Sequence, residues 1–202
     1  MPRESLENAH EDDGNTPLDE DELEGLIPSH LVTRADLNQW EAKNIAVGVT
    51  WYSSRSIDVL DVTMLKELHR RLFDQTWSWA GSYRQSDKNL SPYHWSEVPR
   101  LMRDLVDNTR ARIEAISEEE ELDKLAARFH HELVHIHPWP NGNGRHSRAA
   151  TDLLLRQLRR PAFSWGAASA KSGDPTIRSR YIDAIKQADK GNLEPLYEFV
   201  RS

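Results

Sequence analysis

The sequence predicts a mostly α-helical domain, and two stretches carry most of that prediction. Apolar residues recur at three- and four-residue spacing over residues 122–136, the pattern of one apolar face of an amphipathic helix. The same spacing returns over residues 145–160 (RHSRAATDLLLRQLRR), a segment that ends directly before Pro161. With 202 residues, of which 38% are hydrophobic and 29% charged, the chain has the length and composition of one good-sized globular domain.

The N-terminal residues differ in composition from the rest of the chain. Residues 1–20 are rich in Asp, Glu, Asn and Pro and poor in apolar side chains, so we expect an acidic flexible tail there. Apolar residues first cluster at 22–27, directly before Pro28. We therefore expect the helical domain to span residues 21–202.

Capping residues indicate where some helices begin. Thr33 followed by Asp36 is typical of a helix start, because each side chain can accept a hydrogen bond from the backbone N–H of the other residue. Leu37, Trp40 and Ile45 then continue along one face. Further helices are expected from about Asp61, over 97–116, over 119–137, from a glycine-rich loop to about Arg160, over Ile177–Ala188 and over Leu193–Val200, the last opened by Asn192.

Residues 74–97 interrupt the helical pattern. The stretch combines large aromatic side chains with turn-forming residues: Trp77, Trp79, Tyr83, Trp95, Gly81, Ser82 and Pro92. Such a composition is typical either of a short β-hairpin or of an aromatic loop that caps the core. We expect a short β-hairpin at this place in an otherwise helical domain.

Composition also argues against several classes of protein. The chain has no cysteine, which rules out disulfides and thiol catalysis. The net charge of −7 argues against a broad nucleic-acid-binding face, which usually needs a basic stripe. No apolar run approaches the roughly 20 residues of a membrane span, and the acidic N-terminus lacks the features of a signal peptide. We therefore expect a cytoplasmic protein that binds neither a membrane nor, directly, a nucleic acid.

The most informative stretch is HPWPNGNGRHSR, from His137 to Arg148. Pro138 disfavours a helical backbone at the residue before it, so the preceding helix should end near Ile136. The Asn-Gly pairs that follow adopt left-handed backbone conformations at little cost. A loop of this kind that leads into a helix directs backbone N–H groups into one concavity, which suits an anion.

The charges in this stretch support an anion site. Arg145 and Arg148 lie one turn apart in the first turns of the second helix, where a cation opposes the helix dipole at a cost of about 0.3–1 kcal/mol. Two arginines beside glycines at a helix N-terminus are favourable when a phosphate binds there. His137, a few residues earlier, could then act as a general base. The alternative is an Asn-Gly turn with two solvated arginines.

A second pattern lies just upstream. His131, Glu132 and His135 match H-E-x-x-H, in which two histidines on one helix face bind zinc and the glutamate activates water. The extended pattern has Gly and His where this chain has Pro138 and Asn141, so the third zinc ligand is missing. We interpret His131 and His135 as solvated surface residues, and a zinc hydrolase as a remote alternative.

The stretch from His137 to Arg148 resembles the Fic motif, H-P-F-x-(D/E)-G-N-G-R-x-x-R. It differs by Trp139 in place of Phe and by Asn141 in place of the acidic residue. From TPLDEDELEGLIPSHL to the FSWG segment, roughly residues 16–200, the chain is similar to the Fic/Doc branch called mobile mystery protein B. The resemblance implies a Fic-like helical domain that moves AMP from ATP to a Ser, Thr or Tyr hydroxyl of a target protein.

The resemblance also implies a role for each motif residue. His137 would be the base, Arg145 would hold the β-phosphate and Arg148 the γ-phosphate. The α- and β-phosphates would lie against Gly142, Asn143 and Gly144, and Tyr181 would line the adenine pocket. Gly144 stands where the Doc relatives that phosphorylate carry a lysine, which favours nucleotidyl over phosphoryl transfer.

Asn141 affects the expected strength of the reaction. The matching acidic residue of the family supplies a carboxylate to Mg²⁺, which is expected here together with ATP. An amide oxygen can still coordinate Mg²⁺ but brings no negative charge, so Asn141 is a weaker metal ligand and activity could be reduced. The alternative is a catalytically weak or silent nucleotide-binding module, controlled by an inhibitory segment or by a partner.

Two further segments acquire expected roles from the resemblance. The pattern W-A-G-x-Y-R, from Trp79 to Arg84, precedes the flap that pins the target protein in the family. The candidate target-binding residues are Gln85, Ser86, Asp87, Lys88 and Asn89. Glu24 is a candidate inhibitory glutamate that would pair with Arg148, and a separate antitoxin-like partner is the alternative source of inhibition.

Overall fold

The computed structural model describes residues 19–167 and 176–202, and the predicted mostly helical domain is confirmed within these ranges. Of the predicted tail, residues 1–18 lie outside the described residues, whereas Asp19 and Glu20 lie in the cap and first turn of the first helix. In chain order the helices are α2 (Glu20–Leu23), α3 (Arg34–Ser53), α4 (Val62–Phe73), the 3₁₀ turn η1 (Trp95–Glu97), α5 (Val98–Ala115), α6 (Glu119–Ile136), α7 (Asn143–Gln157), α9 (Ile177–Asp189) and α10 (Glu194–Arg201).

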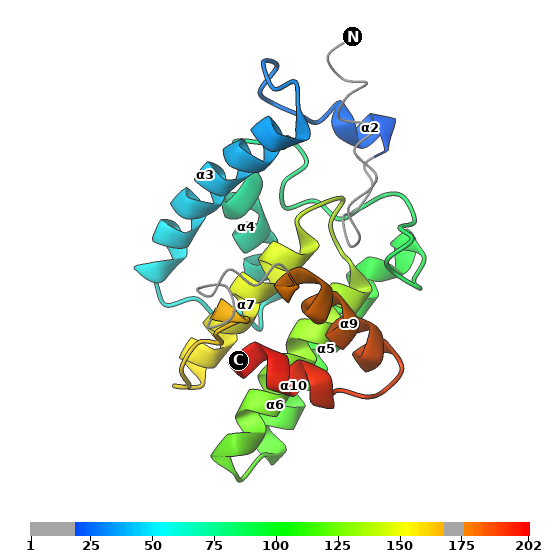
Figure 1. The fold of residues 1–202 in the computed structure, drawn as a ribbon. Coiled ribbons are helices and arrows are strands. Elements are labelled where there is room, and N and C mark those ends of the chain that lie inside the picture. The colour runs from blue at the N-terminus through cyan, green and yellow to red at the C-terminus, as the bar shows by residue number, and fades with distance from the viewer. Residues whose placement is uncertain (1–18, 168–175) are drawn as a thin grey trace.

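The paired helices α6 and α7 form the centre of the molecule (Figure 1). Helix α4 packs on α7 and carries α3 on its outer side, whereas α9 and α10 pack on α6. The predicted apolar faces meet in the core, where Phe129 and Leu133 of α6 and Leu153 of α7 are each no more than 2% exposed. Truncation of one such side chain to Ala costs about 2–5 kcal/mol. The loop between α6 and α7 therefore has rigid supports at both ends.

The predicted start of α3 is confirmed by its cap. The hydroxyl of Thr33 accepts a hydrogen bond from the Asp36 backbone N–H at 3.1 Å, and the Asp36 carboxylate accepts from the Thr33 N–H at 3.0 Å. Asp61 caps α4 in a related way, because its carboxylate accepts from the Thr63 N–H at 2.7 Å. Short polar side chains thus satisfy N–H groups that have no partner within the helix.

Helix α7 ends at Gln157, earlier than the predicted end near Arg160. Arg159 adopts a positive φ of 57°, and the N–H of Arg160 donates to the Leu155 carbonyl at 2.8 Å. A left-handed residue followed by such a bond is the Schellman termination, which satisfies carbonyls at the end of a helix. Periodicity alone could not reveal this end, because Leu158 still fits the apolar spacing.

The predicted β-hairpin is not confirmed. Among the described residues the sole β pairing is an isolated antiparallel bridge between Leu26 and Trp77. This bridge joins the segment after α2 to the segment after α4, rather than two halves of one hairpin. Residues 78–94 form turns and bends, so the aromatic stretch is a structured loop. Trp77 is 1% exposed and lies in the core, which agrees with the alternative of a core-capping loop.

None of the described helices is both long and apolar enough to cross a membrane.

Candidate functional site

The predicted end of α6 is confirmed at Ile136, directly before the loop. His137 lies outside the helical region with φ 53° and ψ 59°, a left-handed rather than an extended conformation. Its N–H still donates to the Leu133 carbonyl at 3.3 Å, so it closes the last turn before Pro138 redirects the chain. A left-handed non-glycine residue at a helix end is uncommon. The backbone at His137 therefore leaves the helix at a defined point, and the ring contacts the Val134 carbonyl through Nδ1.

The imidazole of His137 is neutral near pH 7. The residue is only 4% exposed, and burial lowers its pKa to about 4. Nδ1 lies 3.3 Å from the carbonyl oxygen of Val134, which can only accept a hydrogen bond. This contact assigns the hydrogen to Nδ1 and the lone pair to Nε2. A neutral ring with a basic Nε2 is the form that a general base requires.

Arg84 connects the aromatic loop to His137. This arginine is 1% exposed, and its Nε–H donates to the His137 carbonyl at 2.8 Å. Two more of its N–H groups donate to the carbonyls of Ser86 and Tyr93, both at 2.8 Å. The Arg84 backbone N–H donates to the Pro138 carbonyl at 2.9 Å. Arg84, the arginine that ends the W-A-G-x-Y-R pattern, therefore positions both the aromatic loop and His137.

The N-terminus of α7 is built around Gly142. This residue has φ 78°, and a Cβ atom placed on it would lie 2.5 Å from Cζ of Phe73. The side chain of Asn143 closes the loop, because it accepts from the Trp139 N–H at 2.9 Å and donates to the Trp139 carbonyl at 2.7 Å. The N–H groups of the first turn have no partner within the helix, so they can bind an anion.

Unpaired hydrogen-bonding groups gather in this loop and the helix that follows. Among the described residues five buried side-chain polar atoms have no hydrogen-bond partner, and three of them are Asn141 Nδ2, Ser147 Oγ and Arg148 Nε. Buried polar groups are normally paired, so each exception needs an explanation. Asn141 Nδ2 and Arg148 Nε are donors, and a phosphate offers the acceptor oxygens that they lack.

The two arginines of the loop lie in different surroundings. Arg145 Nη1 forms an ion pair at 2.7 Å with Oε2 of Glu41, a fully buried carboxylate on α3. Arg148 has no carboxylate within ion-pair distance among the described residues. Its guanidinium instead lies 4.5 Å from the ring centroid of Tyr181. Among the described residues Arg145 therefore has an ion-pair partner, Glu41, whereas Arg148 has aromatic neighbours.

Tyr181 lies beside the loop but is held by the protein itself. Its hydroxyl is 2.9 Å from Nε2 of His130, and burial raises its pKa to about 12. Burial likewise lowers the pKa of His130 to about 3. A neutral phenol thus meets a neutral imidazole, next to the Arg148 side chain. The position next to Arg148 is compatible with the predicted adenine pocket, which stays a prediction.

The predicted target-binding segment is in contact with α2. The Nζ atom of Lys88 lies 2.6 Å from Oε2 of Glu22 and 3.0 Å from Oδ2 of Asp19. The hydroxyl of Ser86 donates to the same oxygen of Asp19 at 2.6 Å, and this hydrogen bond is the main cause that lowers the pKa of Asp19. Gln85, Asp87 and Asn89 are exposed. The N-terminal helix therefore covers part of the predicted flap.

The structure does not bring the predicted inhibitory glutamate to its partner. Glu24 is exposed at the end of α2, and neither a hydrogen bond nor an ion pair joins it to Arg148. The glutamate that pairs with an arginine of the loop is Glu41, and its partner is Arg145 rather than Arg148. A signal for Glu41 was present in the sequence, since this acid falls on the apolar face that runs through Leu37 and Trp40.

The histidines of the H-E-x-x-H pattern are not plain solvated residues. His131 and His135 both contact Asp189 of α9 at 2.8 Å. Glu132 instead forms an ion pair at 2.8 Å with Arg112 of α5. The glutamate thus has a partner on another helix, which does not support the zinc hydrolase alternative.

Asn141 does not fit the role of a direct Mg²⁺ ligand. Its Oδ1 already accepts a hydrogen bond from the Gly142 N–H at 2.6 Å, and the atom without a partner is the Nδ2 donor. Glu41, the carboxylate paired with Arg145, accepts from Trp77 and from Arg145 with its two oxygens. The groups offered by the loop are therefore donors for an anion rather than oxygens for a cation.

A hollow of about 620 Å³ lies at the other end of α7. Its lining residues are Ser53, Ser54, Arg55, Ser56, Ile57, Arg156, Gln157 and Arg159. None of the predicted site residues lines it, so we place the candidate site at the His137–Arg148 loop.

Comparison with known proteins agrees with this assignment. The chain is 34% identical over 82 residues to a protein named protein adenylyltransferase Fic from Aedes aegypti, a match that covers 38% of this chain and 14% of that protein. It is 29% identical over 157 residues to the protein of the same name from Nematostella vectensis, and this match covers 73% of this chain and 32% of that protein. The chain therefore spans a third or less of the length of these curated relatives.

A solved structure shows the same fold. The BepC effector protein of Bartonella tribocorum, solved with bound AMPPNP, superposes with a TM-score of 0.70 at 16% sequence identity, covering 89% of this chain and 95% of that one. The model of the Fic/DOC family matches residues 59–155, a range that contains both Arg84 and the complete loop from His137 to Arg148. Residues 59–155 of the chain therefore form a domain of the Fic/DOC family.

Proposed function

We propose that this chain transfers AMP from ATP to a Ser, Thr or Tyr hydroxyl of a protein target. One observation carries the proposal: a neutral imidazole, His137, directly precedes a segment whose buried donors Asn141 Nδ2 and Arg148 Nε have no hydrogen-bond partner in the protein. A base next to a phosphate-binding helix end suits attack of a hydroxyl on a phosphate ester. The name of the curated relatives, protein adenylyltransferase, supports the same reaction.

In the proposed step the hydroxyl oxygen of the target attacks the α-phosphorus of ATP. A new O–P bond forms, the bond from the α-phosphorus to the oxygen that bridges to the β-phosphate breaks, and pyrophosphate leaves. Nε2 of His137 accepts the hydroxyl proton, because Nδ1 keeps its hydrogen toward Val134. Arg84 acts only as a positioning residue, since it bonds the carbonyl of His137 rather than its ring.

The remaining residues of the loop would bind phosphate. The first-turn N–H groups of Asn143 and Gly144 and the guanidinium of Arg148 supply donors and positive charge. Arg145 would bind phosphate with N–H groups other than the one that Glu41 holds, and with a charge that Glu41 partly neutralises. Mg²⁺ bound with the nucleotide would neutralise phosphate charge, and position 141 of the loop offers an amide rather than a carboxylate to hold it.

A second candidate is a nucleotide-binding module with weak or no transfer. The contact that favours it is the pair of Arg145 with buried Glu41, which occupies the arginine predicted for the β-phosphate. An antitoxin-like partner that controls the site would be a feature of either candidate.

Transfer of label from ATP tests the first candidate. Wild-type chain is incubated with a candidate target mixture and Mg²⁺, with α-labelled and γ-labelled ATP in parallel, and compared with His137→Ala. His94→Ala, at an exposed histidine of the aromatic loop, is the matched control. We expect protein-bound label from the α-phosphate that is lost in His137→Ala and kept in His94→Ala. Label from the γ-phosphate alone would contradict the proposal, and nucleotide binding without any transfer would select the silent module.

A further inference from the structure

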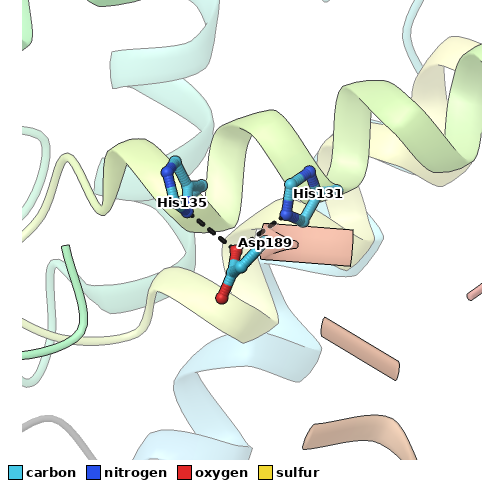
Figure 2. A group of neighbouring side chains, drawn as sticks. All are labelled: His131, His135 and Asp189. Carbon is cyan, nitrogen blue, oxygen red and sulfur yellow. Dashed lines mark hydrogen bonds and ion pairs between the residues drawn. The ribbon is translucent and has the colours of Figure 1, made fainter. Parts of the chain in front are cut away.

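A cluster of two histidines and one aspartate lies outside the loop. His131 and His135, one turn apart on α6, both point toward Asp189, the last residue of α9 (Figure 2). Nε2 of His131 and Nδ1 of His135 each lie 2.8 Å from the same oxygen, Oδ1 of Asp189. The three atoms lie within 4.8 Å of one another. Two helices thus bring three metal-binding side chains to one point.

We propose that His131, His135 and Asp189 form a zinc site. Spacing of four residues on a helix places two imidazoles on one face, and the third ligand comes from a different helix. Two ring nitrogens and one carboxylate oxygen suit Zn²⁺, whereas Mg²⁺ and Ca²⁺ favour oxygen ligands alone. The three protein ligands leave a fourth tetrahedral position for water.

The existing contacts are close to the geometry that zinc needs. Zinc lies about 2.0–2.2 Å from nitrogen and oxygen ligands, so two ligand atoms of a tetrahedral site are roughly 3.3–3.5 Å apart. The two N···O distances of 2.8 Å must therefore open by about half an ångström or slightly more. Each of these nitrogens loses its hydrogen when the metal replaces the two hydrogen bonds to the carboxylate.

An ion can also reach the cluster. The side chains of His131, His135 and Asp189 are 12%, 27% and 37% exposed, so they are ordered by the fold but open to solvent. Each imidazole forms a hydrogen bond to the same carboxylate oxygen of Asp189. A bound metal ion would replace these two hydrogen bonds.

The site would not be hydrolytic. A zinc hydrolase with this helix pattern uses the glutamate between the histidines to activate water. Here Glu132 lies in an ion pair with Arg112 at 2.8 Å. The proposed zinc would instead join the end of α9 to the last turns of α6, which lead directly into His137. Its role is to fix α9, the helix of Tyr181, against α6.

Zinc titration of the full chain tests the proposal. Untagged protein freed of metal is titrated with ZnCl₂ alone, without nucleotide, in the presence of a chromophoric chelator that reports free zinc. We expect one zinc per chain and a rise of the melting temperature on binding. His131→Gln and Asp189→Asn should each weaken binding at least about ten-fold, because even changes behind the ligands cost about 10–100-fold.

Two matched variants control for zinc bound elsewhere. His30→Gln removes an exposed histidine before α3, and Asp183→Asn removes an exposed carboxylate of α9. Both should bind zinc as the wild type does. Equal affinity of all five proteins, or no binding by folded wild type, would overturn the site.

A measurement on the wild-type protein tests the site even if the variants fail to fold. Nitrogen NMR resolves the two ring nitrogens of each histidine, and saturating zinc should shift Nε2 of His131 and Nδ1 of His135. If neither signal moves, the cluster is a hydrogen-bonded group and the proposal fails. Because no nucleotide is present, either result leaves the proposed AMP transfer untouched.

Discussion

Nη1 of Arg145 lies 2.7 Å from Oε2 of Glu41, and Glu41 is fully buried while the arginine side chain is 38% exposed. The second oxygen of the same carboxylate accepts from Nε1 of Trp77 at 2.8 Å. A buried carboxylate thus holds one N–H group of Arg145 and neutralises part of its charge. An anion that binds both arginines of the loop therefore meets an Arg145 whose charge is already partly neutralised.

We expect Glu41→Gln to strengthen nucleotide binding. The amide keeps an acceptor for Trp77 but no longer neutralises Arg145, so ATP affinity should rise about three- to ten-fold, at a loss of about 1–2 kcal/mol in unfolding free energy. Titration of ATP against folded protein measures the effect. Glu132→Gln, which removes a similar ion pair with Arg112 away from the loop, should leave the affinity unchanged. Weaker binding by Glu41→Gln would show that Glu41 supports the site instead.

The two loop glycines should respond differently to alanine. Gly142→Ala forces a side chain into φ 78° and against the Phe73 ring at 2.5 Å, so we expect a loss of about 2–4 kcal/mol in unfolding free energy. Gly144 has nothing within 4 Å of its Cβ position and lies in a helix, so Gly144→Ala should stabilise by up to about 1 kcal/mol. Urea denaturation measures both. Equal losses in the two variants would contradict the packing argument.

Stability should fall in acid because of His146. Its Nδ1 accepts from Trp139 Nε1–H at 3.1 Å while its Nε2 donates to the Leu65 carbonyl at 3.0 Å, an arrangement that only the neutral ring permits. Burial lowers its folded pKa to about 4, below the unfolded value near 6.5. The neutral ring thus contributes stability above pH 6.5 that is lost as the pH falls toward 4, on the order of 3 kcal/mol.

Urea unfolding at pH 7.5 and at pH 5 tests this pH dependence. The wild type should be less stable at the lower pH, and His146→Gln should lose less between the two values. Other buried histidines will keep part of the slope, since burial also lowers the pKa of His69 well below its ordinary value. The exposed His94→Gln variant should behave as the wild type does. A slope that His146→Gln leaves unchanged would assign the effect to other groups.

Asn141→Asp should make nucleotide binding depend more strongly on Mg²⁺. The change adds a negative charge and removes the unpaired Nδ2 donor, so ATP should bind more weakly without Mg²⁺ and at least as well with it. A Mg²⁺ titration of ATP affinity or of transfer measures this change. Asn89→Asp, at an exposed loop position, is the control. An unchanged Mg²⁺ titration would count against any metal role at this position.

Glu22→Gln should loosen the contact of α2 with the aromatic loop. The carboxylate is 12% exposed and its Lys88 partner 3%, so the pair is largely shielded from solvent. We expect faster amide hydrogen exchange over residues 85–89. Glu24→Gln, at an exposed glutamate two residues further along the chain, should leave the amide hydrogen exchange of residues 85–89 unchanged. Glu24→Gly should also leave ATP turnover unchanged, and a clear gain would revive Glu24 as the inhibitory residue.

Local patterns in the sequence predicted the parts of the fold that depend on neighbours in the chain. The cap of Thr33 and Asp36 and the end of α6 before His137 are of this kind. The pair of Glu41 and Arg145 joins positions 104 residues apart, and Asp189 meets His131 across 58 residues. Periodicity carries no information about such distant partners. The sequence could have indicated only that an acid stood on an apolar helix face.

The aromatic loop shows why the hairpin prediction failed. Trp77, Trp79 and Tyr83 have the residue types of a strand, but their rings pack on one another and on the core rather than along a ladder. The loop is instead stabilised by a buried guanidinium that bonds carbonyl oxygens. Because an arginine side chain rather than strand pairing stabilises this loop, the sequence contains no alternating pattern that would have predicted its structure.

Arg84 holds the aromatic loop mainly through bonds to backbone atoms. Its bonds to His137, Ser86 and Tyr93 end on backbone oxygens, which every amino acid provides. Within this segment the Asp87 carboxylate and the Ser91 hydroxyl also contact the guanidinium of Arg84. The exposed side chains of Asn89 and Leu90 are therefore the positions at which new side chains can be introduced while Arg84 and the imidazole stay in place.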